Sequence, residues 1–210
     1  MTTFEERSVR RLLAVTSMLL SYPEQTTLER LGAVQNAAAS LPAGSAEGVM
    51  QVASWLRSTE LVAAQAHYVE IFDRRRRACL YLTYFLNGDT RRRGMALVGF
   101  KESYQAAGFD IGNEELPDFL PVVLEFGAVG DIAVALELLA QHRSGIEVLS
   151  AALHRFSSPY AHAVDALLVV VPAAPEGPTA QELAAAGPPS EFVGLAPFVP
   201  VDSLKVGARA

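Results

Sequence analysis

Hydrophobic positions recur with the spacing of α-helices along the chain from Phe4 to Val171. Apolar side chains return every third or fourth residue, which places them on one face of a helix. Alternation with a period of two, typical of strands, is nearly absent. The pattern therefore predicts an all-α fold, a single-domain helical bundle over residues 1–171. The clearest stripes are Leu61, Ala64, Tyr68, Ile71 and Phe72; Leu97, Phe100 and Tyr104; Ile132, Ala135, Leu136 and Leu139; Ile146, Leu149, Leu153 and Phe156; and Val164, Leu167, Leu168 and Val171.

Residues that commonly begin or end helices fall between these stripes. Small polar residues favour the first position before a helix, and glycine favours the position after its end. The expected starts are a capping box of Thr26 with Glu29, N-caps at Ser45 and Thr59, and an N-cap at Ser158 followed by Pro159; the expected ends are Gly108 and Gly130.

The composition changes at Pro172. Seven of the 12 prolines fall in the last 39 residues, so residues 172–210 are expected to form a Pro/Gly-rich, flexible tail. A short helix is expected near Thr179–Ala186. Four later side chains could pack back onto the bundle, namely Phe192, Leu195, Phe198 and Val199.

Charge and cysteine content exclude several classes of protein. The formal net charge of −6 disfavours a general nucleic-acid binder. Cys79 is the only cysteine, which rules out an intramolecular disulfide and suits a reducing cytoplasm. Arg10 and Arg11 precede an apolar run, but that run keeps helical spacing and Pro23 follows it, so we expect no targeting signal. The apolar stretch 166–171 is far too short to span a membrane, and stable membrane insertion is not expected.

No familiar catalytic or metal-binding pattern is present. His67 and Glu70 form the one histidine–glutamate pair with i, i+3 ligand spacing, and a metal centre would need more. Phosphate loops, nucleophile elbows and cysteine–histidine signatures are missing. The sequence therefore predicts a protein that is not an enzyme and needs no cofactor. An enzyme with an unfamiliar carboxylate pair is a minor alternative.

Charged residues surround the aromatic middle of the chain. Glu70 points away from the stripe of Tyr68 and Phe72, and Asp73 falls where that helix should end. Two arginine runs, Arg74–Arg77 and Arg91–Arg93, flank the aromatic segment 81–85. Each run could be a solvated helix end, or part of a cationic rim for a carboxylate-bearing peptide or an anionic cofactor.

Two short segments predict sharp changes of chain direction. Gly88, followed by Asp89 and Thr90, should end one helix and begin the next. Residues 115–121 contain two prolines around Asp118, an N-cap candidate that should open the next helix, with Pro121 in its first turn. Glu125 borders the apolar face of that helix, where it could pair with a partner's donor or a nearby arginine.

Four motifs in this order resemble the nitrate reductase delta subunit family of assembly chaperones: YVEIFD at 68–73, LTYF at 82–85, GDTRRRGMAL at 88–97 and ELPDFLPVVLEF at 115–126. Tyr81 stands where a histidine is frequent in the family, and Phe119 where histidine or tyrosine is common. The resemblance implies a TorD-like, all-helical chaperone in the cytoplasm. It implies binding to the N-terminal segment of the nitrate reductase catalytic (alpha) subunit, and support of molybdenum cofactor insertion, with cofactor delivery proteins as further partners.

For such a chaperone we expect a groove with two walls joined by a corner. An amphipathic helix from the partner would bury its apolar face there, and charges on the rim would set its orientation. A generic helical adaptor for another protein is the alternative. The expected first wall is Tyr68, Glu70, Phe72 and Asp73; the second wall is Leu116, Pro117, Asp118, Pro121 and Glu125; and Gly88 and Asp89 form the corner.

Overall fold

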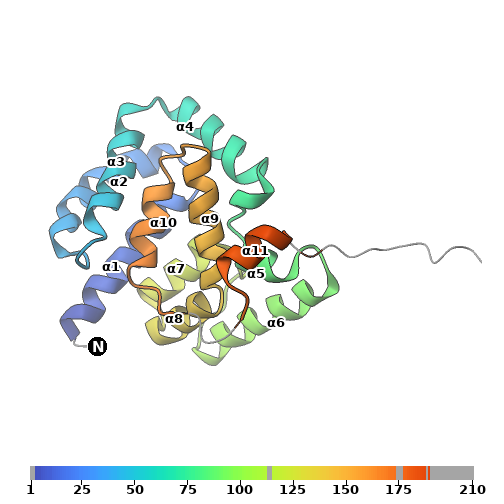
Figure 1. Cartoon of the computed structure of the whole chain (residues 1–210). Helices are drawn as coiled ribbons and strands as arrows, with labels where there is room; N and C mark the ends of the chain where they lie inside the picture. The colour runs from blue at the N-terminus through green and yellow to red at the C-terminus, as the bar shows by residue number, and fades with distance from the viewer. Residues whose placement is uncertain (1–2, 113–114, 174–176, 188, 190–210) are drawn as a thin grey trace, which may run out of the picture.

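The computed structural model describes residues 3–112, 115–173, 177–187 and 189, and that part of the chain is all-helical (Figure 1). The α-helices are α1 Thr3–Leu20, α2 Gln25–Ala37, α3 Ala46–Ser58, α4 Leu61–Tyr68, α5 Leu82–Asn87, α6 Arg91–Ala106, α7 Leu120–Val129, α8 Ile132–Gln141, α9 Arg143–Arg155, α10 Ala161–Leu168 and α11 Ala180–Ala186. Shorter turns are η1 Ala38–Ser40, the π-helical η2 Val69–Asp73 and η3 Arg76–Ala78. The predicted all-α class is confirmed.

The core forms where α1 packs against α7 and where α10 packs against α3 and α9. Gly127 lets α1 and α7 approach closely, because a Cβ atom there would lie 2.7 Å from Cδ1 of Leu13. Gly48 does the same for α3 and α10, since its Cβ would lie 2.3 Å from the carbonyl oxygen of His162. Close-packed interiors leave no room for these extra atoms. The apolar stripes read from the sequence therefore become contacts between helices.

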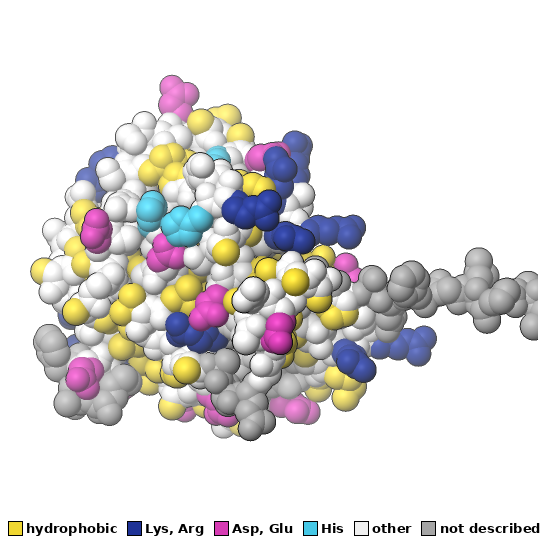
Figure 2. Space-filling view, viewed as in Figure 1, with side chains coloured by type: hydrophobic (Ala, Val, Ile, Leu, Met, Phe, Trp, Pro, Cys, Tyr) yellow, Lys and Arg dark blue, Asp and Glu magenta, His cyan; other side chains and the backbone are white. Residues whose placement is uncertain are grey.

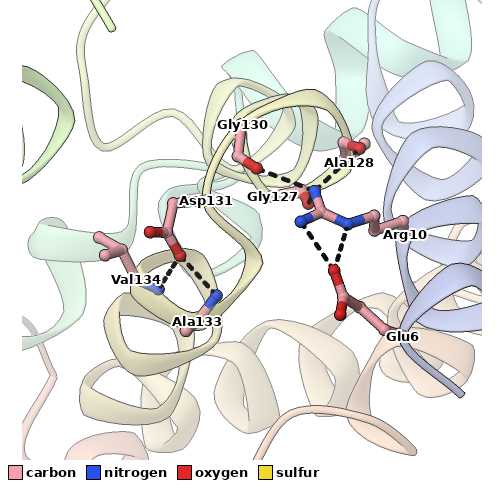
Figure 3. A network of polar contacts seen from close by, with 8 residues as sticks. All are labelled: Glu6, Arg10, Gly127, Ala128, Gly130, Asp131, Ala133 and Val134. Atoms are coloured by element: carbon pink, nitrogen blue, oxygen red, sulfur yellow. Dashed lines mark hydrogen bonds and ion pairs between the residues drawn. The ribbon is translucent and has the colours of Figure 1, made fainter. Parts of the chain in front are cut away.

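Arg10 on α1 binds the end of α7 (Figure 3). Its Nη1 donates to the carbonyl oxygens of Gly127 at 3.1 Å, Ala128 at 3.3 Å and Gly130 at 2.9 Å. Glu6, one turn earlier, holds the guanidinium through its Oε1 at 2.9 Å. The last carbonyls of a helix have no partner within it, so a cation at this end is stabilising. An arginine near the N-terminus thus has a structural role in the bundle.

The predicted helices are confirmed more closely than their caps. Gly130 ends α7 and Gly108 follows α6 with a φ of +79°. The other corrections concern the starts. α2 begins earlier than expected, because Glu24 and Thr27 form the capping box in place of Thr26 and Glu29. Ser45 precedes α3 as expected, but its hydroxyl donates to the Pro42 carbonyl and does not cap the helix. Thr59 ends α3 and Glu60 precedes α4, while Ser158 and Pro159 form a turn before α10, which begins at Ala161.

The chain after α10 folds back over the bundle. Arg143 on α9 donates to the carbonyl oxygens of Leu168, at 3.3 Å, and Val171, which fixes the chain's exit from α10. The expected short helix is present as α11, drawn in orange-red against α9 in Figure 1. Phe192, Leu195, Phe198 and Val199 lie outside the described residues. In the described part of the chain, no helix is both long and apolar enough to cross a membrane.

Candidate functional site

The first predicted wall begins in a helix that changes its winding. α4 runs directly into the π-helical turn η2, which ends at Asp73 as predicted. Tyr68 and Phe72 are buried, and the Tyr68 hydroxyl donates to the carbonyl oxygen of Leu20 at 3.0 Å. Burial raises the pKa of Tyr68, so its hydroxyl stays protonated. These two aromatic residues support the wall from behind.

Tyr160, in the turn directly before α10, organises the aromatic residues behind this wall. Its ring lies 5.8 Å from that of Tyr68, 5.1 Å from Phe72 and 5.3 Å from Trp55. His67 stacks on Tyr160 at 5.9 Å, and burial lowers the pKa of this histidine. Such ring pairs stabilise a packed cluster beyond the effect of buried area. Sequence reasoning missed Tyr160, because its position 90 residues further along gave no sign of this contact.

Glu70 and Asp73 are the accessible acids of the first wall. Glu70 pairs with Arg75 and, at 3.4 Å, with Arg74. The hydrogen bond from Arg75 is the main reason why the pKa of Glu70 is lowered. The expectation that Glu70 points away from the Tyr68 stripe is confirmed. Two of the four arginines at 74–77 are therefore matched locally by one carboxylate.

Two distant chain segments pair beside this wall. The Leu82 amide donates to the carbonyl of Asp118 at 3.0 Å, and the Leu120 amide donates to the carbonyl of Leu80 at 2.8 Å. Between them, Tyr81 and Phe119 form an isolated antiparallel bridge, and their ring centroids lie 5.3 Å apart. Two of the motifs read from the sequence therefore form one structural unit.

Asp118 is buried inside this unit and caps α5. Its Oδ2 accepts hydrogen bonds from the Thr83 amide at 3.1 Å and the Thr83 hydroxyl at 2.6 Å. The prediction that Asp118 caps the following helix is wrong, because Phe119 precedes α7 and the carboxylate turns toward the paired segment instead. Among the described residues, its Oδ1 has no hydrogen-bond partner. Asp118 shapes the second wall from within.

A set of aromatic and charged side chains lies beside the paired segments. We call it the tyrosine–arginine rim; it comprises Tyr81, Tyr84, Asp89, Arg93 and Glu115. The Arg93 guanidinium lies 5.5 Å from the Tyr81 ring centroid and 6.0 Å from that of Tyr84, and it pairs with Asp89 at 3.2 Å. Cation–π contacts of this kind hold an arginine in place.

Glu115 completes the rim on its other side. The Tyr81 hydroxyl donates to Oε1 of Glu115 at 3.1 Å, and burial together with this acid raises the pKa of Tyr81 to about 12. Leu116 beside it is 39% exposed. The expected groove residues do not include four members of the rim: Tyr81, Tyr84, Arg93 and Glu115. The sequence does place the aromatic segment 81–85 beside the arginine run 91–93.

The predicted corner between two helices is confirmed. Gly88 ends α5 with a φ of +57°, and Thr90 precedes α6 with its hydroxyl donating to the Asn87 carbonyl at 2.8 Å. A positive φ favours glycine. Pro189 also lies over this corner, because a Cβ atom on Gly88 would come 1.6 Å from the Pro189 carbonyl oxygen.

The remaining residues of the second wall extend toward α1. Pro117 and Pro121 are buried, and Pro121 lies in the first turn of α7 as expected. Their carbonyl oxygens accept hydrogen bonds, from Tyr104 at 2.7 Å and from Ser17 at 2.8 Å. Glu125 is exposed and lines a hollow of about 500 Å³ between α1, α2 and α7.

The structure brings the two walls next to each other near Tyr68. After the larger effect of burial, the charges of Asp73 and Glu115 and the hydroxyl of Tyr81 also raise the pKa of Tyr68. On the other side, the Tyr22 ring packs 5.4 Å from Tyr68 and lines the same hollow as Glu125. The surface from η2 over the rim to α7 is therefore one neighbourhood, built on buried aromatic rings with charges of both signs at its edge.

The histidine and cysteine side chains that the structure describes lie outside the two expected walls. Among the described residues, no three histidine, cysteine or acidic side chains are arranged to hold a metal ion. His154, on the opposite end of α9 from Arg143, pairs with Asp165 at 2.7 Å, which links α9 to α10. The Cys79 thiol is free, and burial raises its pKa to about 11, so it stays protonated and unreactive at neutral pH.

Known proteins are similar to this chain in sequence and in fold. Residues 38–166 match the family model described as nitrate reductase delta subunit. The chain is 34% identical over 163 residues to the nitrate reductase molybdenum cofactor assembly chaperone NarJ of Escherichia coli K12, covering 74% of this chain and 67% of NarJ. It is 39% identical over 151 residues to the nitrate reductase-like protein NarX of Mycobacterium tuberculosis H37Rv, covering 72% of this chain. The chain spans only 23% of the length of NarX.

A solved structure agrees with these matches. A protein from Archaeoglobus fulgidus, described as a redox enzyme maturation protein, aligns with a TM-score of 0.55 and 25% identity over 76% of this chain and 91% of its own. The names of the Escherichia coli and Archaeoglobus fulgidus relatives describe an assembly chaperone and a maturation protein, in agreement with the expectation that the chain is not a catalyst. The matching family model covers more than half of the sequence, and the helical bundle matches as well. The chain belongs to the nitrate reductase delta subunit family.

Proposed function

We propose that this chain is a cytoplasmic assembly chaperone that binds the N-terminal segment of the nitrate reductase catalytic (alpha) subunit. In this role it keeps that subunit competent for molybdenum cofactor insertion, together with the proteins that deliver the cofactor. The similarity to a chaperone named for nitrate reductase assembly supports the proposal. The observation that carries it is the tyrosine–arginine rim beside exposed Leu116.

The rim suits a peptide that presents an apolar face and charged flanks. Leu116 offers an exposed apolar contact, and the partly exposed rings of Tyr81 and Phe119 continue it. Arg93 packs on the Tyr81 ring, Glu115 accepts from the Tyr81 hydroxyl, and the two side chains carry opposite charges. Opposite charges at the edges of an apolar patch fix the direction in which a helix lies.

The expected groove residues then take two different parts. The exposed side chains, Glu70, Asp73, Asp89, Leu116 and Glu125, contact the peptide. The buried ones support these contacts from below: Tyr68 and Phe72 through their rings, Gly88 through its turn, and Pro117, Asp118 and Pro121 through the chain path of 115–121. No residue in either group acts as a catalyst in this proposal.

Titration calorimetry with a synthetic copy of the catalytic subunit's N-terminal segment tests this function. Burial of apolar surface predicts saturable binding with a negative heat-capacity change. Leu116→Ser should weaken binding roughly tenfold, as expected for an apolar contact at the centre of an interface. The matched control is Val62→Ser, at an apolar position on α4 that is 75% exposed.

Three outcomes of the calorimetry would contradict the proposal. They are the absence of heat with the catalytic-subunit peptide, equal weakening by the control variant, and equal binding of a peptide with the same composition in scrambled order. The last result would favour a generic adaptor.

A further inference from the structure

A second groove lies between α9 and α11. It is a hollow of about 250 Å³ whose floor is Val148, Ala151 and Ala152 on α9. Arg77 and Arg155 line its edge, and Ala180 and Ala184 of α11 close it. Val148 and Ala152 are buried in the structure. This groove is separate from the tyrosine–arginine rim.

The helix that occupies the groove is held by few contacts. α11 has seven residues, and none of them is buried. Ala180 and Leu183 are its only side chains that pack against the core among the described residues. A helix this short is unstable alone, because its nucleation cost is not recovered over so few hydrogen bonds. Its capping box of Thr179 with Glu182 helps it to form. Detachment of α11 therefore costs little free energy.

The edge of the groove is strongly basic on a molecule with a net charge of −6. Arg74–Arg77 and Arg155 are exposed, and Figure 2 shows Lys and Arg side chains gathered on the side of the molecule near α4 and α11. Among the described residues, the ion pairs in this region join Glu70 to Arg74 and Arg75, and Glu147 to Arg143. None of these three pairs involves Arg77 or Arg155, which remain available to an acidic partner.

The occupant shows which kind of helix fits this groove. α11 faces α9 with small alanine side chains and one leucine. Its only charged residue, Glu182, is bound to Thr179 and does not line the groove, so the preference for an acidic helix rests on Arg77 and Arg155 at the edge. Small side chains let a helix lie close to the alanines of α9, and an acidic group is complementary to the arginines at the edge. α11 also leads to Pro189, which lies over the Gly88 corner.

We propose that the groove on α9 is a second docking surface, for a partner's acidic amphipathic helix with small apolar side chains, and that α11 occupies it in the free chain. The partner helix displaces α11, and this displacement also withdraws Pro189 from the Gly88 corner. The proposal stands independently of the partner bound at the tyrosine–arginine rim.

The test uses the full chain and a fluorescent peptide that copies residues 178–187. Leu183→Glu in the chain should detach α11, and Ala185→Glu is the matched control, because Ala185 is exposed on the same helix and does not line the groove. In the wild type and the control, the tethered α11 competes with the peptide for the groove at an effective concentration of about 1 mM. Loss of this competition should let the peptide bind Leu183→Glu roughly fivefold more tightly. Fluorescence anisotropy measures this binding.

Charge reversal then tests the edge of the groove. In the Leu183→Glu background, Arg77→Glu with Arg155→Glu should weaken peptide binding several-fold, whereas Arg57→Glu on distant α3 should leave it unchanged. Circular dichroism checks that each variant keeps its helical content.

Several results would overturn the proposal. They are equal peptide affinity for wild type and Leu183→Glu, no saturable binding to either, and equal weakening by Arg57→Glu. Another is arginine-dependent binding to phosphatidylglycerol vesicles without peptide binding, which would assign the basic edge to a lipid surface.

Discussion

At the scale of single residues, Asp118 shows how a side chain in a recognition motif can act through the fold. Its position between two prolines suggested a cap for the next helix or a contact to a partner. The structure buries it against Thr83, where it accepts hydrogen bonds from the amide and the hydroxyl of that residue in the first turn of α5. This role depends on a segment 35 residues earlier in the chain, and local sequence rules contain no information about such a distant pairing.

Replacement of Asp118 by alanine should therefore destabilise the fold. The Thr83 amide and hydroxyl would lose their acceptor in a buried site, which costs about 2 kcal/mol. Glu115→Ala, at an exposed position three residues earlier, should change stability by less than about 0.5 kcal/mol. Urea unfolding followed by circular dichroism measures both. Equal stability of the two variants would show that the Asp118 cap contributes nothing.

His142 gives the protein a pH dependence of stability. It is buried against Phe100 at 5.2 Å, and its Nδ1 lies 2.8 Å from the Leu138 carbonyl. Burial lowers the pKa of His142 below its usual 6.5, and the Leu138 hydrogen bond and the Asp118 charge only partly oppose this. Below pH 6.5 the unfolded chain thus binds a proton that the folded chain resists, so stability falls as the pH drops through that value.

The pH dependence should be smaller in His142→Gln. Burial also lowers the pKa of His67. The His142→Gln variant should therefore still lose some stability as the pH falls below 7, because His67 remains. The free energy of unfolding, measured in urea at several pH values, provides the comparison. An unchanged slope in His142→Gln would exclude this histidine as its source.

At the scale of helices, periodicity predicted which segments are helical, and local capping rules predicted their ends less well. The three stripes after residue 131 became α8, α9 and α10, because burial of one apolar face decides helix formation. The start of α2 moved from Thr26 to Glu24, since either residue can accept from a nearby amide and the sequence does not choose between them. The turn after Ser158 also delayed the start of α10.

Glycines within helices lie at two kinds of position, close crossings between helices and open helix faces. Gly48→Ala would place its Cβ 2.3 Å from the His162 carbonyl oxygen, and separating α3 from α10 should cost about 1–3 kcal/mol. Gly99 on α6 has no atom within 4 Å of a built Cβ, so Gly99→Ala should stabilise the chain by about 0.5–1 kcal/mol through helix propensity. Thermal unfolding compares the two, and a stabilised Gly48→Ala would contradict the close crossing.

At the scale of the whole molecule, the sequence predicted the segments of the candidate site but not how they meet. The motifs at 82–85 and 115–126 pair through backbone hydrogen bonds of Leu80, Leu82 and Leu120, and these contacts span more than 35 residues. Tyr160 joins the site from the turn before α10, and Tyr22 joins it from the loop between α1 and α2. Because such contacts depend on the packing of the bundle, a single sequence predicts which segments form the site more readily than which residues contact one another there.

The central claim is that the surface from η2 over the tyrosine–arginine rim to α7 grips the leading segment of the nitrate reductase catalytic subunit. Hydrogen–deuterium exchange of the full chain, with and without a peptide of that segment, tests it most directly. The account predicts slower exchange at residues 68–75, 80–93 and 116–126, with little change in α10. Protection confined to other helices, or none at saturating peptide, would contradict it.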